Sequence, residues 1–174
     1  PKMLTLAPTA TAIKTYDGTT SVSSDQISYT VDGLVSRNSI LDDVSVTSAD
    51  LVAKVANVNA GNTTFVGSGT FELDGADKGN YSLSAGAVVS GSAVVNQREL
   101  AMTFAANKVY DATRDLTGAQ FSLTNVVGSD DVSVAMSGTA TDAFDDKNVG
   151  SSKTLTINDT SVLAIAGSSA ANYT

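Results

Sequence analysis

The feature that most constrains this chain is an internal repeat, in which three short motifs occur twice and in the same order. The motifs are Lys-x-Tyr-Asp-Gly/Ala-Thr at 14–19 and 108–113, Asp-Asp-Val-Ser-Val at 42–46 and 130–134, and Gly/Ala-Asn-Tyr-Ser/Thr at 79–82 and 171–174. The separation between matching motifs drifts by only a few residues, as insertions and deletions in loops produce. The sequence therefore predicts two copies of one structural unit.

The boundary between the copies follows from the repeat. We expect a first domain over residues 1–96 and a second over 97–174, each carrying five basic and nine acidic residues. The join at 96–99 contains no Pro or Gly, so we expect the last strand of one copy to run almost directly into the next copy. So short a join limits bending and favours a rod.

The second copy is shorter than the first at its end. In the first copy, residues 82–96 follow Tyr81 and are typical of a strand, whereas only Thr174 follows Tyr173. A missing strand would leave backbone groups of the second copy unpaired. We therefore expect the corresponding strand to lie beyond Thr174 in a longer chain. The alternatives are that this strand is disordered or that a neighbouring molecule supplies it.

Short runs of alternating apolar and polar residues, bounded by Gly, Asn, Asp or Ser, predict strands throughout. Examples lie at 27–31, 100–104, 132–136 and 155–157. No stretch shows a convincing helical period. The pattern predicts an all-β fold of two tandem small antiparallel β-sandwich repeats of the immunoglobulin-like kind. A β-grasp-like sheet with one short helix is the alternative.

The composition argues against most catalytic designs. The chain has no Cys, His or Trp, so thiolate nucleophiles, histidine bases and the usual transition-metal ligands are missing. Glutamate occurs only as Glu72 and Glu99, so the sequence offers few glutamates for the pair of catalytic carboxylates that a glycosidase uses. We expect no enzyme. A net charge of −8 disfavours nucleic acid as a partner. The sequence contains no run of 18 apolar residues and therefore predicts no membrane-spanning helix.

Four motifs together resemble a known family. They are the three repeated motifs and Asp-Lys-Asn-Val-Gly at 146–150, and the chain is similar to the YDG repeat of large bacterial surface and filamentous-haemagglutinin-like adhesins, which is related to MBG-type repeats. The chain departs from the pattern at Ala112, where Gly is usual, and at 56–59, where Asp-Lys-Asn-Val is expected.

The resemblance implies a tandem structural repeat at the cell surface or in the extracellular space. We expect a stalk or spacer that projects a distal binding region, with neighbouring repeats of the same chain as its partners and glycan or host surface bound by other regions. The alternative is that the repeats themselves bind glycan or matrix protein, or associate with one another. An exposed aromatic or apolar patch favours this alternative.

The motif residues are interpreted as structural, with no catalytic or cofactor-binding residue among them. They are Lys14, Tyr16, Asp17, Gly18, Asn80, Tyr81, Lys108, Tyr110, Asp111, Asn172 and Tyr173. The Asp caps a turn, the Gly takes a positive φ, and the tyrosines act as core anchors. The paired aspartates at 42–43 and 130–131 are interpreted as caps of a turn before the strand and not as a shared binding site, since neighbouring strand residues face opposite ways.

Two chemical alternatives stay open. We expect no cofactor, but Asp74 and Asp77 lie in an Asp- and Asn-rich loop, so Ca²⁺ is the one ion that the sequence suggests. The loop spacing does not match an EF-hand, and the second copy has no acids there. The other alternative is an isopeptide bond in each copy, from Lys14 to Asn80 and from Lys108 to Asn172.

Overall fold

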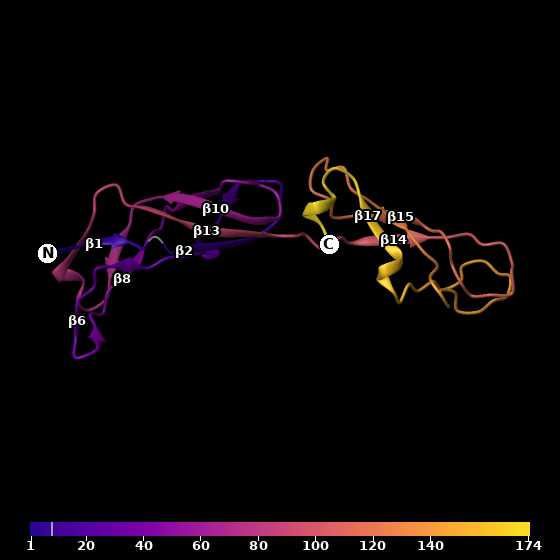
Figure 1. Ribbon diagram of the computed structural model, residues 1–174, viewed down its shortest axis with the longest axis horizontal. Coiled ribbons are helices and arrows are strands. Elements are labelled where there is room, and N and C mark those ends of the chain that lie inside the picture. Colours follow the sequence, from indigo (N-terminus) through magenta and orange to yellow (C-terminus); the bar gives the residue numbers. More distant parts are fainter. Residues whose placement is uncertain (8) are drawn as a thin grey trace. The chain divides into compact units, whose positions relative to one another are not determined.

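The computed structural model describes residues 1–7 and 9–174, which divide into two compact units, Pro1–Gln97 and Arg98–Thr174 (Figure 1). We call these unit 1 and unit 2 and describe each by itself. Both are built of strands, and the helical segments of the described residues are single 3-10 turns of three residues. None of those turns could carry this part of the chain across a bilayer. The all-β fold is confirmed.

The described residues of unit 1, 1–7 and 9–97, form thirteen strands and two 3-10 turns. They are β1 (Lys2–Leu6), β2 (Ala10–Thr15), β3 (Ser21–Val22), η1 (Ser24–Gln26), β4 (Ile27–Ser28), β5 (Val31–Asp32), β6 (Ser36–Arg37), β7 (Ile40–Leu41), β8 (Ser45–Thr47), β9 (Val52–Val55), β10 (Gly61–Ser68), β11 (Glu72–Asp74), η2 (Lys78–Asn80), β12 (Tyr81–Leu83) and β13 (Val88–Asn96). Most are short because Gly, Asn, Asp and Ser, which favour turns, punctuate the sequence every few residues.

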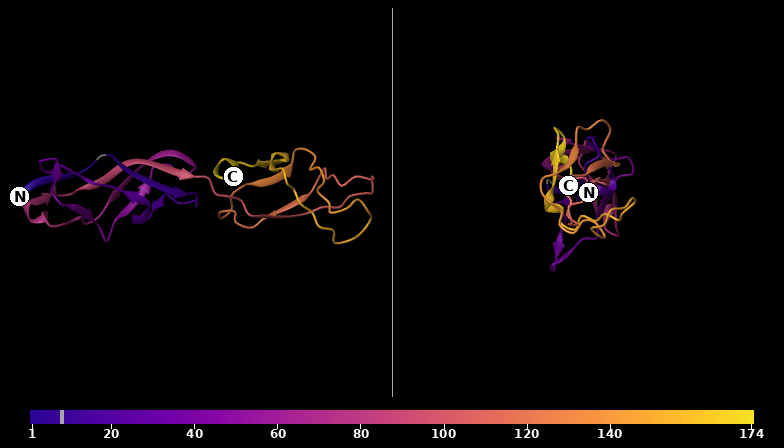
Figure 2. Two further views of the ribbon diagram at one scale, coloured as in Figure 1. Left: turned by 90° about the horizontal axis from the view of Figure 1, so that it is seen from below. Right: turned by 90° about the vertical axis from the view of Figure 1, so that its right-hand side faces the viewer.

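The main sheet of unit 1 has six strands in the order β3-β9-β10-β13-β2-β4. Strand β13 lies near its centre, antiparallel to β10 over eight residue pairs and parallel to β2 over six. The pink ribbon of β13 can be followed along both neighbours in Figures 1 and 2. The last strand of the unit thus joins its early and middle segments into one sheet.

Smaller sheets complete unit 1. β1 lies between β12 and β5, and β8 pairs with β11. Most strand pairs are antiparallel, as expected, but β1–β12 and β2–β13 are parallel. The sequence pattern did not predict that these two pairs are parallel. Alternation of apolar and polar residues determines on which face of the sheet a side chain lies, but it does not determine whether neighbouring strands are parallel or antiparallel. The helix of the β-grasp alternative has no counterpart in the described residues of unit 1.

The core of unit 1 forms where alternate residues of the central strands point inward. Phe65 of β10 is 1% exposed, and Val89 and Val95 of β13 are 0% and 1% exposed. Leu4 of β1 is equally buried. Because β13 supplies two of these four side chains, it is both a sheet strand and a large part of the core.

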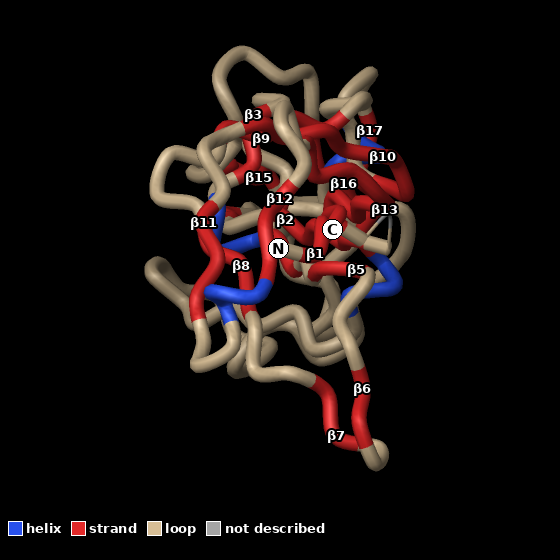
Figure 3. Tube along the Cα trace, turned by 90° about the vertical axis from the view of Figure 1, so that its left-hand side faces the viewer, coloured by secondary structure: helices blue, strands red, loops and turns tan. Residues whose placement is uncertain are grey.

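One hairpin leaves the body of unit 1. β6 and β7 pair only with each other, through a turn in which Asn38 and Ser39 both have positive φ, and Figure 3 shows the hairpin extending away from the sheets. Positive φ at both central residues is typical of the tight turn that matches strand twist. Ile40 and Leu41 on this hairpin are 72% and 61% exposed.

Unit 2 contains fewer strands over a comparable stretch of chain. They are β14 (Met102–Ala105), β15 (Gln120–Leu123), β16 (Ser133–Met136) and β17 (Leu163–Ala166), with the 3-10 turns η3 (Thr160–Val162) and η4 (Ala170–Asn172). β14 pairs with β15 and β16 with β17, both antiparallel. The centre of its core is a small cluster of Leu116, Ala140 and Ala143.

Candidate functional site

The first motif of unit 1 is a turn built around a buried lysine. Lys14, near the end of β2, is 3% exposed, and its ammonium group donates hydrogen bonds to Asp17 Oδ1 at 2.7 Å and to the backbone carbonyls of Thr19 at 2.9 Å and Ser21 at 2.7 Å. Asp17 Oδ1 also accepts from the N–H and the hydroxyl of Thr19. The hydroxyl oxygen of Thr19 lies 3.3 Å from the same ammonium, which therefore contacts four acceptor atoms of a single loop.

Unit 2 repeats this turn bond for bond. The ammonium of Lys108 contacts Asp111 Oδ1 at 2.8 Å and donates to the carbonyls of Thr113 at 3.1 Å and Asp115 at 2.6 Å. Asp111 accepts from the N–H and hydroxyl of Thr113 in turn. Since every charged group of the motif is used inside the turn, its geometry is that of a structural element. We call it the lysine turn, residues 14–21 and 108–115.

The lysine turn needs one residue in the left-handed backbone region. Gly18 has φ of +75° and Ala112 has φ of +67°. Glycine reaches this region without a steric cost, whereas alanine brings its Cβ too close to the following carbonyl. The departure from the family pattern at Ala112 therefore keeps the turn but strains the backbone of unit 2.

The turn also keeps its carboxylates ionised. Burial opposes ionisation of Asp17, but the hydrogen bonds from Lys14 and Thr19 outweigh it and lower the pKa of that carboxyl. The bond from Lys108, followed by that from the Thr113 backbone, lowers the pKa of Asp111 from 3.8 to about 2. The ion pairs therefore persist through the whole neutral and mildly acidic range.

The second and third motifs meet in space in both units. The hydroxyl of Tyr81 donates to the Asp42 carboxylate and accepts from the N–H of Val35 at 3.0 Å. The hydroxyl of Tyr173 donates to Asp130 at 2.6 Å and accepts from the N–H of Val127 at 2.9 Å.

We call this contact the tyrosine clasp. The hydrogen bond to Asp42 is the largest cause that raises the pKa of Tyr81. For Tyr173, burial comes first and the bond to Asp130 second, and both raise its pKa. Both hydroxyls thus stay protonated and able to donate at neutral pH.

The second aspartate of each pair holds a different segment. The carboxylate of Asp43 accepts from the N–H of Ala76 at 3.1 Å, and that of Asp131 accepts from the N–H of Ser168 at 2.9 Å. Each pair therefore contacts the tyrosine with one residue and a distant turn with the other. Asp43 and Asp131 thus cap the turns before η2 and η4 and not the turns that precede their own strands, whereas Asp42 and Asp130 contact the tyrosines.

The residues suggested for calcium are engaged otherwise. Asp74 pairs with Lys78 at 3.2 Å, and Asp77 accepts from the N–H of Asp43 at 2.9 Å. Among the residues that the structure describes, no three His, Cys, Asp or Glu side chains gather as a metal ion would require. Nothing in this loop resembles the shell of six to eight oxygen ligands that calcium takes.

The structure does not bring together the residues of the isopeptide alternative. The acceptors of Lys14 lie at residues 17–21 and those of Lys108 at 111–115. Asn80 and Asn172 instead end η2 and η4, directly before the clasp tyrosines. Lysines and asparagines therefore belong to different contacts in each unit.

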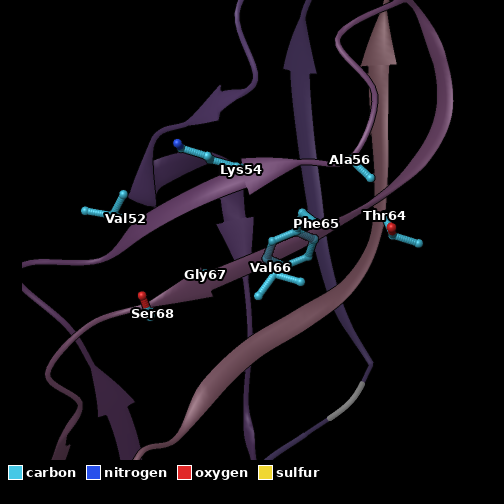
Figure 4. Close-up of a pocket in the computed structure, with 8 residues that line it drawn as sticks. All are labelled: Val52, Lys54, Ala56, Thr64, Phe65, Val66, Gly67 and Ser68. Atoms are coloured by element: carbon cyan, nitrogen blue, oxygen red, sulfur yellow. The ribbon is translucent and has the colours of Figure 1, made fainter.

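A shallow groove of about 440 Å³ crosses the outer face of β9 and β10. Figure 4 shows its eight lining residues, among which Val52 and Val66 are 64% and 59% exposed. Phe65 is the one aromatic residue of the eight and is only 1% exposed. The groove thus offers apolar surface but no ring on which a sugar could stack.

One expectation for the motif tyrosines is wrong. Tyr16, Tyr81 and Tyr173 are 4%, 6% and 2% exposed, as core anchors should be, but Tyr110 is 57% exposed. In unit 1 the backbone N–H of Tyr16 donates to the carbonyl of Asn96 at the end of β13. Unit 2 has no strand in that position within the described residues, so nothing equivalent covers Tyr110.

Comparison with protein families finds one match, described as the YDG domain, over residues 1–88 and again over 96–174. The comparisons with curated proteins and with solved structures gave no match. The first matched segment ends where β13 begins, so it contains the lysine turn and the tyrosine clasp of unit 1 but hardly any of the strand that closes the sheet.

Proposed function

The chain belongs to the YDG-domain family, and from this premise we propose that its two units are spacer modules of a bacterial cell-surface or secreted adhesin. In this role they stand between the cell and a distal binding region and transmit force along the chain. Tandem copies, an acidic composition with a net charge of −8 and the absence of Cys fit an extracellular module.

The observation that carries the proposal is the parallel pairing of β2 with β13 in unit 1. β2 lies near the start of the unit and β13 ends it, and six residue pairs join them in register from Ala10–Gly91 to Thr15–Asn96. Tension applied at the two ends of the unit pulls parallel neighbours past each other. All the hydrogen bonds between them then bear load together, whereas bonds that open in sequence fail one at a time.

The motif chemistry supports a structural role rather than an enzymatic one. The lysine turn and the tyrosine clasp use their ionisable groups to bind one another, and this occurs in the same way in both units. A catalytic site instead leaves a base or nucleophile directed at a substrate. We therefore propose no reaction for these modules.

The experiment places two, four or eight copies of the chain between a surface anchor and a binding domain of known ligand. We expect capture of ligand-coated beads to depend on the binding domain, and the reach from the cell surface to increase with copy number. The matched control is the same array without the binding domain. Capture of the beads by that control would contradict the spacer role.

One observation favours the second candidate function, direct binding by the repeats. The β6–β7 hairpin presents Ile40 and Leu41 to solvent at 72% and 61% exposure. Exposed apolar side chains on a projecting element are a common feature of contact surfaces. If the array without the binding domain adheres to matrix protein or to itself, I40S and L41S together should abolish that adhesion, whereas they should leave a pure spacer unchanged.

A further inference from the structure

Unit 2 contains a groove of about 720 Å³. Two stretches of chain line it, residues 104–110 on one side and 144–155 on the other, with Thr113 beside them. Figure 2 draws both stretches mainly as loops. Val109 and Val149 are 88% and 86% exposed there, so the groove leaves apolar side chains uncovered.

The internal repeat identifies the same two stretches in unit 1. The lysine turn aligns Lys108 with Lys14, which places residues 104–109 at the position of β2. The bridge between Phe144 and Leu155 aligns with the pair Val55 and Phe65, which places the chain around Leu155 at the position of β10. The groove therefore lies between the counterparts of β2 and β10.

In unit 1 this position is occupied by β13. The strand pairs with β10 on one side and with β2 on the other, and its inward residues Val89, Ala93 and Val95 are at most 3% exposed. In unit 2 the flanking stretches are not strands for most of their length. Among the described residues, no acceptor holds the N–H of Tyr110, whereas Asn96 of β13 accepts from Tyr16.

We propose that the groove of unit 2 is an acceptor site for one extended strand with the chemistry of β13, joined to the chain at Thr174. Its occupant pairs antiparallel with residues around 151–158 and parallel with 104–109, as β13 does with β10 and β2. Backbone hydrogen bonds supply the affinity and alternate inward side chains supply the specificity.

Unit 1 defines what that strand must contain. Its inward positions read Val89, Gly91, Ala93 and Val95, and at Gly91 the strand comes so close to β2 that a Cβ would lie 1.8 Å from the carbonyl oxygen of Ala10. The occupant therefore carries small or β-branched inward residues and a glycine opposite Phe104. A bulky residue at this glycine prevents the approach.

The connection at Thr174 follows from the same comparison. Tyr173 sits in the clasp as Tyr81 does, and β13 begins at Val88, a short loop after β12 ends at Leu83. A second copy cannot lend its own β13 without opening unit 1, where Val89 and Val95 are almost fully buried. A strand joined directly to Thr174 reaches the groove without that cost.

The test extends the full chain with a second copy of the segment 83–96 placed after Thr174. We expect amide hydrogen exchange at Tyr110 to slow by roughly tenfold or more, because its N–H gains an acceptor equivalent to the Asn96 carbonyl that holds Tyr16 in unit 1. Unfolding of unit 2 should also move to higher denaturant concentration. The matched control carries the same extension with valine at the position that copies Gly91 and should show neither change.

Two results would overturn the proposal. One is equal protection of Tyr110 by the extension and by its valine control, which would mean that any added chain covers the groove. The other is protection that appears only in a dimer separated by size-exclusion chromatography with light scattering, because the strand would then come from a neighbouring copy. Protection in a monomer, with none in the control, is the expected result.

Discussion

At the scale of single residues, each unit depends on polar side chains that bond to one another across long stretches of sequence. Lys14 is almost completely buried, yet its ammonium contacts four acceptor atoms within the lysine turn. Tyr81 reaches Asp42, thirty-nine residues earlier. A buried polar group is tolerated when its bonds are complete, so these contacts fix where the loops and strands meet.

The left-handed position of the lysine turn gives the first prediction. G18A should destabilise unit 1 by about 1 kcal/mol, because alanine is strained at positive φ. A112G should stabilise unit 2 by a similar amount for the same reason. Urea denaturation followed by fluorescence or circular dichroism measures both. Destabilisation of unit 2 by A112G would contradict the account of this turn.

The second prediction concerns acid. Asp111 has a pKa of about 2 in the folded chain against 3.8 as its ordinary value, so between these values the unfolded chain binds more protons. Its contribution to the stability of unit 2 is thus complete above about pH 4 and disappears as the pH falls to about 2.

The measurement compares D111N with the parent chain from pH 7 to pH 2. The variant should unfold at lower denaturant concentration at pH 7, and the difference should vanish near pH 2. A difference that stays constant over this range would show that the carboxylate charge has no part in holding the turn.

At the scale of strands and turns, much of the structure could be predicted from the sequence. Alternation at 100–104 and 132–136 located β14 and β16 near their observed positions, and the recurrence of Asp-Gly and Asp-Ala predicted a turn, because these are local signals. The pairing of Asp42 with Tyr81 could not be predicted, although both motifs recur, because sequence spacing does not show which distant segments meet.

The exposure of Tyr110 could not be predicted either, since it depends on a strand far from it in sequence. In unit 1 the covering strand begins more than seventy residues after Tyr16. The one available sign was that residues 97–174 contain no counterpart of the segment 83–96. Burial of a repeated motif therefore follows from its neighbours and not from the motif alone.

The third prediction tests how closely β13 must approach β2. G91V should destabilise unit 1 by about 3 kcal/mol or more, because the added side chain meets the Ala10 backbone, which cannot move aside as a flexible side chain can. The control is S92V, on the exposed side of the same strand, which should change stability little. Differential scanning calorimetry of the two variants measures the contrast. Equal melting temperatures would show that the approach is not required.

At the scale of the whole chain, two units share one set of contacts but differ in how completely the sheet is formed. The lysine turn and the tyrosine clasp occur in both. Unit 1 adds a six-stranded sheet with β13 inside it, whereas unit 2 has two-stranded pairs and a groove. The repeated motifs therefore specify the loops and corners, and the strand after the clasp completes the six-stranded sheet of unit 1.

The central claim is that β13 and β2 bear tension in shear, and single-molecule pulling tests it most directly. The chain has no cysteine, so engineered cysteines define the points of attachment. T9C with N96C pulls the parallel strands past each other, whereas N62C with N96C separates antiparallel β10 and β13 from one end. We predict a rupture force several times higher for the first pair than for the second. Equal forces for the two pairs would contradict the account.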